Sequence, residues 1–230
     1  MITIAIITAM QSEYNAIASL YNFEDKDGIS RTKVYNKNIM LIKSGIGKVN
    51  GALATQKACN EGADIVITTG LAGGIDNNLT QGDIVLADNV CYHDVWCGEP
   101  NLKGQIQDLP AQYKVSKELL TAITDSATNK DYFIIGQTVT GDQFLTDTVR
   151  LKEIKSDFPK ALAVDMESSA VAQVCYLNNK KFLSLRIISD VVGKENQVDE
   201  YNSFWDNVPH KASQMVDKVI KAIPTDDVVY

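Results

Sequence analysis

The sequence contains few arginines and very few histidines. Among its 230 residues, 22 Lys and Arg stand against 29 Asp and Glu, which gives a net charge of −7, and the arginines are Arg31, Arg150 and Arg186. Proteins that bind nucleic acid or anionic membranes rely on clustered cations. The composition therefore argues against both kinds of partner. The histidines, His93 and His210, lie far apart, which argues against a metal site built from close histidine pairs.

Cysteine is also scarce. The four cysteines, Cys59, Cys91, Cys97 and Cys175, form no C-x-x-C pair and lie in apolar or mixed surroundings. We interpret them as small buried side chains of a protein in a reducing compartment. A disulfide between Cys91 and Cys97 is the alternative.

The sequence lacks a long apolar run. Residues 1–8 are apolar, but they have no cationic start and are far too short to cross a bilayer. We therefore interpret this segment as a β-strand and expect a cytoplasmic protein.

What the chain does contain is a regular alternation of two patterns. Short apolar runs rich in β-branched residues alternate with longer stretches of helical period, which is typical of an α/β sheet covered on both faces. No linker or internal repeat divides the chain. We expect one α/β domain over residues 1–223, with a central mixed β-sheet flanked by helices on both faces, and a loosely held tail over residues 224–230. The predicted strands cover residues 2–8, 38–43, 64–69, 83–90, 132–140, 161–164 and 182–188, and the predicted helices cover residues 11–21, 49–60, 116–127, 166–177 and 203–223.

The segment from Tyr92 to Tyr113 interrupts this alternation. It holds His93, Trp96, two prolines and two glycines, with little periodicity. Irregular segments of this length inside a domain are usually functional or lie at an interface.

Polar residues directly follow most of the predicted strands. Glu13 follows the first strand, Glu167 follows the strand at 161–164, and Asp190 follows the strand at 182–188. Ligands of α/β sheets bind beyond the carboxyl ends of the strands, so we expect these three acids at one edge of the sheet. Carboxylates gathered in a cleft push their pKa values apart, which lets one site hold a proton donor and a proton acceptor. The alternative for Glu13 and Glu167 is a first helical turn, where the helix dipole favours a negative charge.

Two glycine-rich segments also follow predicted strands. Ser44–Lys48 matches neither a Walker loop nor the G-x-G-x-x-G fingerprint. Thr69–Gly74 either lets the backbone approach a ligand closely or forms a strand-to-helix turn with positive φ. Serine catalysis is disfavoured, because the chain has no G-x-S-x-G elbow and little histidine to act as a base.

Eight short motifs occur in order along these strand ends. They are Ala9-Met10-x-x-Glu13, Lys43-Ser44-Gly45-Ile46-Gly47-Lys48-Val49, Thr69-Gly70-x-Ala72-Gly73-Gly74, Gly82-Asp83-Ile84-Val85, Tyr92-His93-Asp94, Gly141-Asp142-x-Phe144, Val164-x-Met166-Glu167 and Arg186-x-Ile188-Ser189-Asp190. Together they resemble the 5′-methylthioadenosine/S-adenosylhomocysteine nucleosidases of the nucleoside phosphorylase superfamily, over about Ile2 to Ile223.

The resemblance implies hydrolysis of the bond between adenine and a 5′-thio-substituted ribose, without metal or organic cofactor. Glu13 would activate the attacking water, with Arg186 nearby, and Asp190, held by Ser189, would protonate the adenine leaving group. Glu167 would bind the ribose hydroxyls. The other implied substrate contacts are Met10, Leu71, Ala72, Gly73, Phe144, Leu145, Met166 and Tyr201. The resemblance also implies a homodimer, with the Tyr92–Tyr113 segment at its interface and near the partner's 5′ pocket.

Three departures from the family pattern leave the preferred 5′ group open. They are residues 95–101, Leu71, where many relatives carry a small polar residue, and Asp165, where a glutamate is usual. Rival functions are phosphorolysis, for which Lys48 is the obvious candidate cation, a futalosine-type nucleosidase, and a non-catalytic nucleoside-binding module. Retention of all three acids argues against the binding module.

Overall fold

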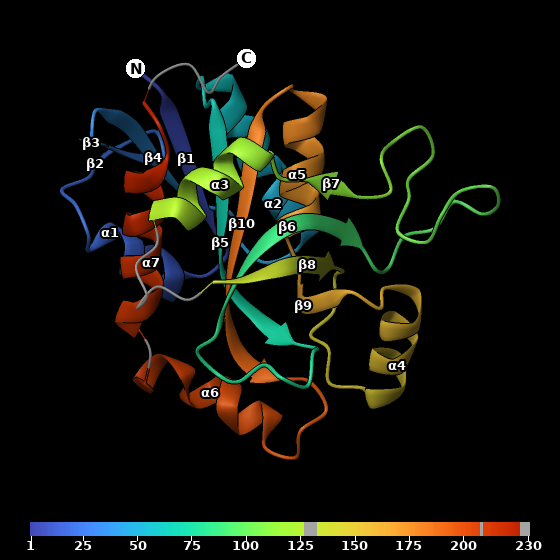
Figure 1. The fold of residues 1–230 in the computed structure, drawn as a ribbon. Coiled ribbons are helices and arrows are strands. Elements are labelled where there is room, and N and C mark those ends of the chain that lie inside the picture. Colours follow the sequence, from blue (N-terminus) through green and yellow to red (C-terminus); the bar gives the residue numbers. More distant parts are fainter. Residues whose placement is uncertain (127–132, 208, 226–230) are drawn as a thin grey trace.

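A computed structural model describes residues 1–126, 133–207 and 209–225. It confirms the predicted α/β class, because helices lie on both sides of one mixed sheet of ten strands (Figure 1). The strands are β1 (Thr3–Thr8), β2 (Glu24–Lys26), β3 (Ile29–Val34), β4 (Lys37–Lys43), β5 (Ile65–Gly74), β6 (Ile84–Tyr92), β7 (Tyr113–Lys114), β8 (Ile134–Thr140), β9 (Ala161–Asp165) and β10 (Lys181–Val191).

Part of the sheet closes on itself. Strand β5 pairs in parallel with β1 and β10 and, near Gly73, antiparallel with β9. Strand β10 pairs with β6, β6 pairs with β8, and β8 pairs with β9. The five strands β5, β10, β6, β8 and β9 therefore form a ring, while β1, β4, β3 and β2 extend the sheet on one side. The ring brings the carboxyl ends of β5 and β10 together.

The helices cover both faces of the sheet. Helices α2 and α5 pack against each other on one face, whereas α1, α3 and α7 lie on the other (Figure 1). Helix α6 packs against β10, and α4 packs Ile154 near Val139 of β8 and Val164 of β9. The helices are α1 (Gln11–Ala18), α2 (Lys48–Asn60), α3 (Lys117–Ser126), α4 (Thr148–Asp157), α5 (Ser168–Leu177), α6 (Gln197–Asn207) and α7 (Pro209–Ala222).

The core is built on the central strands. Ile4 and Ile6 of β1 and Ile65 and Ile67 of β5 are almost completely buried. Burial of a side chain of this size stabilises the fold by about 1.5–3 kcal/mol. Five of the six β1 residues are buried in an unbroken run, as expected for a strand covered on both faces.

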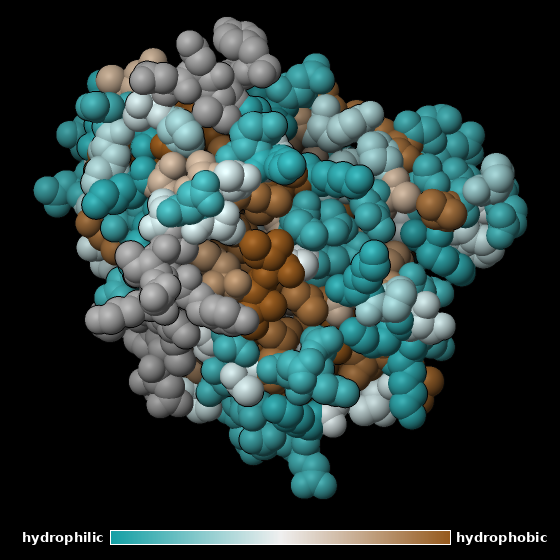
Figure 2. All heavy atoms as spheres, in the orientation of Figure 1, coloured by the Kyte–Doolittle hydropathy of each residue, from teal (hydrophilic) through white to brown (hydrophobic). Residues whose placement is uncertain are grey.

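The surface seen in Figure 2 is mostly hydrophilic, with an apolar band over the middle of the sheet between α3 and α6. Helical cover on this face is therefore incomplete there. Within the described ranges, no helix has the length and apolar character needed to cross a membrane.

The structure corrects several predicted boundaries. Strand β5 runs on to Gly74, so the glycine-rich segment is strand and not a strand-to-helix turn, and β10 runs on to Val191. The predicted helix over residues 203–223 corresponds to α6 and α7, and residue 208, between them, lies outside the described residues. The short strands β2, β3 and β7 and the helix α4 were not predicted. Residues 127, 132 and 226–230, which end predicted elements, lie outside the described residues.

The cysteines are free, without the alternative Cys91–Cys97 disulfide. Cys91 and Cys175 are buried and Cys59 is half-buried, as predicted for small core side chains, but Cys97 is exposed. Its exposure follows from its place in the irregular segment after β6, which projects from the body of the molecule (Figure 1).

Candidate active site

A pocket of about 580 Å³, including its open mouth, lies where the carboxyl ends of the ring strands meet. Its size is within the usual range for small-molecule sites. Every predicted substrate contact lines it, together with the predicted catalytic residues Glu13 and Asp190. Its lining consists of Ala9, Met10, Glu13, Ile46, Leu71, Ala72, Gly73, Gln143, Phe144, Leu145, Val164, Asp165, Met166, Glu167, Ser189, Asp190, Val192 and Tyr201.

Glu13 is fixed by three main-chain donors. Its Oε2 accepts hydrogen bonds from the backbone N–H groups of Ala9 and Met10, both at 2.9 Å, and its Oε1 accepts one from the N–H of Leu71 at 3.0 Å. The first two bonds cap the start of α1, and the third joins Glu13 to β5. The carboxylate is only 5% exposed, so it is held rigidly at the pocket wall.

The approach of Glu13 to β5 depends on Gly70. A Cβ atom at Gly70 would stand 2.4 Å from Oε1 of Glu13 and 2.9 Å from Nη1 of Arg186. Real Cβ atoms do not make contacts this short. The glycine-rich segment therefore lets a carboxylate and a guanidinium reach the strand, whereas the sequence suggested close approach of a ligand.

Arg186 is completely buried behind the pocket. Its Nε lies 2.7 Å from Oδ2 of Asp165, and its Nη2 lies 3.5 Å from Oε2 of Glu167. Burial by itself lowers the pKa of Arg186, but Asp165 and Glu167 raise it above its ordinary value. The guanidinium is thus a permanent buried cation, and its ion pairs are with Asp165 and Glu167.

Asp165 is the second buried charge of this network. Its Oδ1 accepts a hydrogen bond from Oγ1 of Thr140 at 2.6 Å, and Ser168 Oγ donates to Oδ2. Ser168 Oγ also lies 3.1 Å from Nη2 of Arg186. The shorter side chain at position 165 is therefore fully engaged, and it anchors Arg186 under the pocket.

Glu167 lies at the bottom of the pocket and precedes α5. Its Oε1 accepts a hydrogen bond from the N–H of Gly47 at 2.9 Å. Burial raises the pKa of Glu167 to about 7, and Arg186 opposes this rise while Asp165 adds to it. Glu167 therefore changes its protonation state near neutral pH.

Asp190 lies across the pocket from Glu13. Ser189 Oγ donates to its Oδ1 at 2.5 Å, and Gln197 Nε2 donates to its Oδ2 at 2.8 Å. Burial raises the pKa of Asp190, whereas the bonds from Ser189 and Gln197 lower it and the charge of Glu200 raises it. Asp190 lies inside β10 at an irregularity in its pairing with β5, which turns the strand locally.

Three large side chains from separate elements surround the pocket mouth. The rings of Phe144 and Tyr201 are 5.0 Å apart, and the hydroxyl of Tyr201 lies 3.8 Å from the sulfur of Met10. Phe144 is 51% exposed, so an aromatic face is available to a flat ligand.

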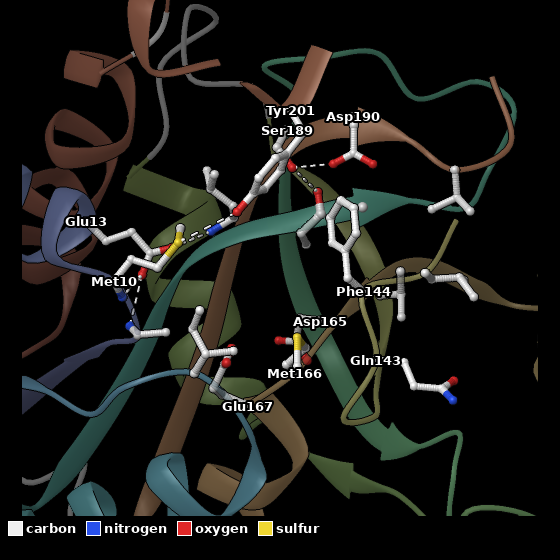
Figure 3. A pocket seen from close by; sticks show the side chains of 18 residues that line it. Met10, Glu13, Gln143, Phe144, Asp165, Met166, Glu167, Ser189, Asp190 and Tyr201 are labelled. Atoms are coloured by element: carbon white, nitrogen blue, oxygen red, sulfur yellow. Dashed lines mark hydrogen bonds between the residues drawn. The ribbon is translucent and has the colours of Figure 1, made fainter. Parts of the chain in front are cut away.

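Figure 3 shows Glu13 on one side of the pocket, Asp190 on the opposite side and Glu167 below. A carboxylate at one wall and a carboxyl with raised pKa at the other provide a proton acceptor and a proton donor around one cavity. In the described part of the chain, no group of three His, Cys, Asp or Glu side chains is placed to hold a metal ion.

The three acids lie together at one edge of the sheet, as predicted from their places after strands. The alternative, a place at the start of a helix for Glu13 and Glu167, is also partly matched. Glu13 does lie in the first turn of α1, and Glu167 occupies the N-cap position of α5 without a side-chain capping bond, yet both also line the pocket. The partners Ser168 and Gln197 were not predicted. Lys48, the candidate phosphate cation, is paired with Asp94 at 2.7 Å and lies 3.8 Å from Asp142.

The sequence is similar to a known protein family and to individual characterised proteins. The model of the phosphorylase superfamily matches residues 3–221. The chain is 35% identical to the 5′-methylthioadenosine/S-adenosylhomocysteine nucleosidase of Bacillus licheniformis, over 96% of this chain and 99% of that protein.

Two solved structures are also similar to the chain over nearly its whole length. The nucleosidase of the same name from Neisseria meningitidis, solved in complex with methylthio-immucillin-A, has a TM-score of 0.90 and 31% identity, covering 97% of this chain and 100% of the other. A futalosine hydrolase mutant of Helicobacter pylori has a TM-score of 0.89 and 25% identity, covering 97% of this chain and 100% of the other.

Proposed function

Because the chain belongs to the phosphorylase superfamily and, within it, to the 5′-methylthioadenosine/S-adenosylhomocysteine nucleosidases, we propose that it hydrolyses 5′-methylthioadenosine or S-adenosylhomocysteine. The products are adenine and the 5-thio-substituted ribose. Membership of this family makes the protein a purine N-glycosyl hydrolase. We propose this substrate and the residue roles given below. We also propose that residues 1–223 form the nucleosidase domain.

The observation that carries the proposal is the pair of carboxyl groups on opposite walls of one pocket. Glu13 is held by three N–H donors, which keep its carboxyl oxygens at the pocket wall. Burial raises the pKa of Asp190, which favours a proton on that group. One group is thus set to accept a proton and the other to donate one.

Asp190 is the general acid. It donates its proton to the imidazole-ring nitrogen of adenine as the glycosidic bond breaks, so adenine leaves as a neutral base. Ser189 holds Asp190 in place, Phe144 stacks on the purine, and the main chain of Leu145 reads its Watson–Crick edge. General acid catalysis by a positioned group contributes about 10²–10⁴-fold to the rate.

Glu13 is the general base. It removes a proton from the water that attacks the anomeric carbon. Breaking the glycosidic bond leaves positive charge on the ribose, and the carboxylates of Glu13 and Glu167 stabilise that charge. Glu167 also accepts hydrogen bonds from the ribose hydroxyls, with Met166 under the sugar and Tyr201 and Met10 beside the 5′ group.

Charge at the site favours water over phosphate as the nucleophile. Among the described residues that line the pocket, none is Lys or Arg. Arg186 is engaged by Asp165 and Glu167, and Lys48 is engaged by Asp94. A phosphate nucleophile requires cations or many donors, and these cations already have partners.

The proposal is tested by incubating the protein with methylthioadenosine, adenosylhomocysteine, adenosine, inosine and futalosine, each with and without phosphate. We expect free adenine from the first two substrates without phosphate. A strict phosphate requirement would make the protein a phosphorylase, and cleavage of futalosine alone would make it a futalosine hydrolase. If no base is released from any substrate, the catalytic proposal is wrong.

The variant Asp190→Asn tests the role of the acid. Asparagine keeps the size of the side chain but carries no acidic proton, so we expect release of adenine to fall by about 10²–10⁴-fold. Circular dichroism should show an unchanged fold. Hydrolysis of methylthioadenosine at the parent rate would remove Asp190 from this role.

We further propose that the enzyme works as a homodimer in the cytoplasm. The free cysteines fit a reducing compartment. Val49 and Leu53 of α2 and Trp96 and Leu102 of the projecting segment are exposed apolar side chains, and the Lys48–Asp94 ion pair joins the start of α2 to that segment. Such side chains are typical of interfaces.

The dimer is tested by light scattering on the variant Leu53→Glu, with Val149→Glu on α4 as the control. Leu53 and Val149 are both exposed apolar residues. We expect the parent protein and the control to have the mass of a dimer and Leu53→Glu to have the mass of a monomer. A monomeric parent protein would contradict the proposal.

A further inference from the structure

Gln197 makes an unusual set of contacts behind the proposed acid. It is the first residue of α6 and is 4% exposed. Its Nε2 donates one hydrogen bond to Oδ2 of Asp190 and one to the carbonyl oxygen of Leu145, both at 2.8 Å. Its Oε1 accepts a hydrogen bond from the N–H of Gly193 at 3.1 Å. Both hydrogens of the amide are therefore used, and the side chain is fixed at both of its polar atoms.

The two acceptors of Gln197 belong to different walls of the pocket. Asp190 lies on β10, and Leu145 lies in the segment between β8 and α4. Both line the pocket, whereas Gln197 itself does not. The amide therefore bridges the two walls from outside the cavity, and it sets the distance between the Asp190 carboxyl group and the Leu145 main chain.

We propose that Gln197 is a positioning residue that holds Asp190 and the main chain of Leu145 in the spacing that one purine base requires. This inference rests on the proposed function, in which Asp190 protonates the five-membered ring and Leu145 reads the six-membered ring. A purine is rigid, so its two edges meet both partners together only when the spacing between them is fixed. The amide of Gln197 provides that fixed spacing before substrate binds.

The contacts of Gln197 also affect the proton on Asp190. A donor to a carboxylate favours the ionised form, and Gln197 and Ser189 both lower the pKa of Asp190 against the effect of burial. The other ionisable groups that act near Asp190 are Glu200 and Tyr201 of α6. Burial and the charge of Glu200 raise the pKa of Asp190, and the Gln197 amide opposes them. Removal of the amide should therefore raise the pKa of Asp190 further.

Gln81 provides a matched control. Its Nε2 also donates two hydrogen bonds, to the carbonyl oxygens of Ser189 at 3.0 Å and Glu200 at 2.7 Å. Gln81 therefore fastens α6 to β10, as Gln197 does, but it touches neither the carboxyl group of Asp190 nor Leu145. A purely structural role of Gln197 would be reproduced by Gln81→Leu.

The kinetic experiment compares Gln197→Leu with Gln81→Leu on two substrates. One is methylthioadenosine, and the other is the p-nitrophenyl 5-methylthioriboside, whose leaving group departs as a stable anion and needs no proton. For Gln197→Leu we expect kcat/KM to fall by about 10- to 100-fold on methylthioadenosine and by less than about threefold on the nitrophenyl substrate. For Gln81→Leu we expect equal losses on both substrates.

The pH profile gives a second readout. Because the pKa of Asp190 rises when the amide is removed, the basic limb of kcat/KM on methylthioadenosine should move to higher pH in Gln197→Leu and stay in place in Gln81→Leu. The variant Gln197→Glu should be more active than Gln197→Leu at acidic pH. There the glutamic acid is protonated and can donate one hydrogen bond to Asp190 or to Leu145. Equal behaviour of the two leucine variants in both readouts would overturn the proposal.

A titration of the carboxyl groups by carbon-13 NMR, with Asp190→Asn to assign the Asp190 resonance, does not require turnover. We expect a higher pKa of Asp190 in Gln197→Leu, or in Gln197→Glu if the leucine variant does not fold. If the parent protein hydrolyses no nucleoside but this shift is seen, the proposed function fails and the contact of Gln197 with Asp190 stands. An unchanged pKa with normal hydrolysis by the parent protein refutes the role of Gln197 alone.

Discussion

At the scale of single residues, Glu13 serves two purposes with one carboxylate. Its Oε2 caps the first turn of α1, and its Oε1 meets the N–H of Leu71 on β5. The helix start therefore holds the proposed base against the strand on which the pocket is built. Glutamine at this position would keep one carbonyl oxygen for the helix cap but would place its NH₂ group against the N–H of Leu71.

Glu13→Gln should lose activity and still bind substrate. Glutamine cannot take a proton from water, so we expect turnover of methylthioadenosine to fall by about 10²–10⁴-fold. Calorimetry on the inactive variant should still detect binding of methylthioadenosine, because the proposed contacts to adenine lie on the other side of the pocket. Undiminished turnover would rule out Glu13 as the base.

Sequence reasoning reached some of the site residues and missed others for a physical reason. Glu13, Glu167 and Asp190 follow apolar runs, so their common location could be predicted from topology alone. Gln197 bonds to residues that are 7 and 52 positions away, and nothing in its local sequence marks either contact. In the sequence, Asp165 stands out only as a departure from the family pattern. Its role as the partner of Arg186 and Ser168 follows from the structure.

At the scale of elements, β5 differs most from its prediction. The segment Thr69–Gly74 contains three glycines, which usually weaken a strand, yet it continues β5 because β10 pairs with it along its whole length. Tertiary pairing overrides local preference here. Gly70 lies where Glu13 of α1 and Arg186 of β10 come close to the backbone.

Gly70→Ala tests this explanation. The added methyl group would overlap with Glu13 and Arg186, and neither can move freely because both are buried and bonded. We expect a loss of stability of about 1–3 kcal/mol in denaturant unfolding and a fall in turnover of at least about tenfold.

Gly62→Ala is the control for backbone effects. Gly62 has a φ of 86°, but a Cβ there would meet no atom within 4 Å. We expect a loss of about 1 kcal/mol from the left-handed conformation with full activity. A Gly70→Ala enzyme that is as active as this control would show that the close approach of Glu13 to β5 is dispensable.

The elements that the sequence did not reveal have little apolar content. All three residues of β2 are exposed, and in α4 Ile154 is the buried residue, so neither carries a strong periodic pattern. The central strands were predicted well because they are buried on both faces.

At the scale of the whole molecule, buried carboxyl groups make stability depend on pH. Burial raises the pKa of Glu167 to about 7 in the folded protein, whereas glutamate in an unfolded chain has a pKa of about 4.3. Between these two values the unfolded state releases a proton that the folded state keeps. The contribution of Glu167 to stability therefore falls as pH rises through this window, and it is constant above and below it.

Glu167→Gln should reduce this pH dependence. We expect the free energy of unfolding of the parent protein to decrease more steeply between about pH 4.5 and 7 than that of the variant, measured by urea unfolding at a series of pH values. Glu153→Gln on α4, where the side chain is exposed, serves as the control and should follow the parent curve. Identical slopes for the parent protein and Glu167→Gln would contradict the buried titration.

The ring of five strands has a consequence for association between copies during folding. Strands in a ring are paired on both sides, so they offer no edge to which another chain could add. On the other side the sheet ends at β2, which is three residues long and consists of Glu24, Asp25 and Lys26, all exposed. Short charged edge strands resist edge-to-edge aggregation. The architecture that gathers the pocket-forming strands thus leaves the β2 margin on a segment unsuited to amyloid-like pairing, and the margin at β7, which pairs with β6, is two residues long.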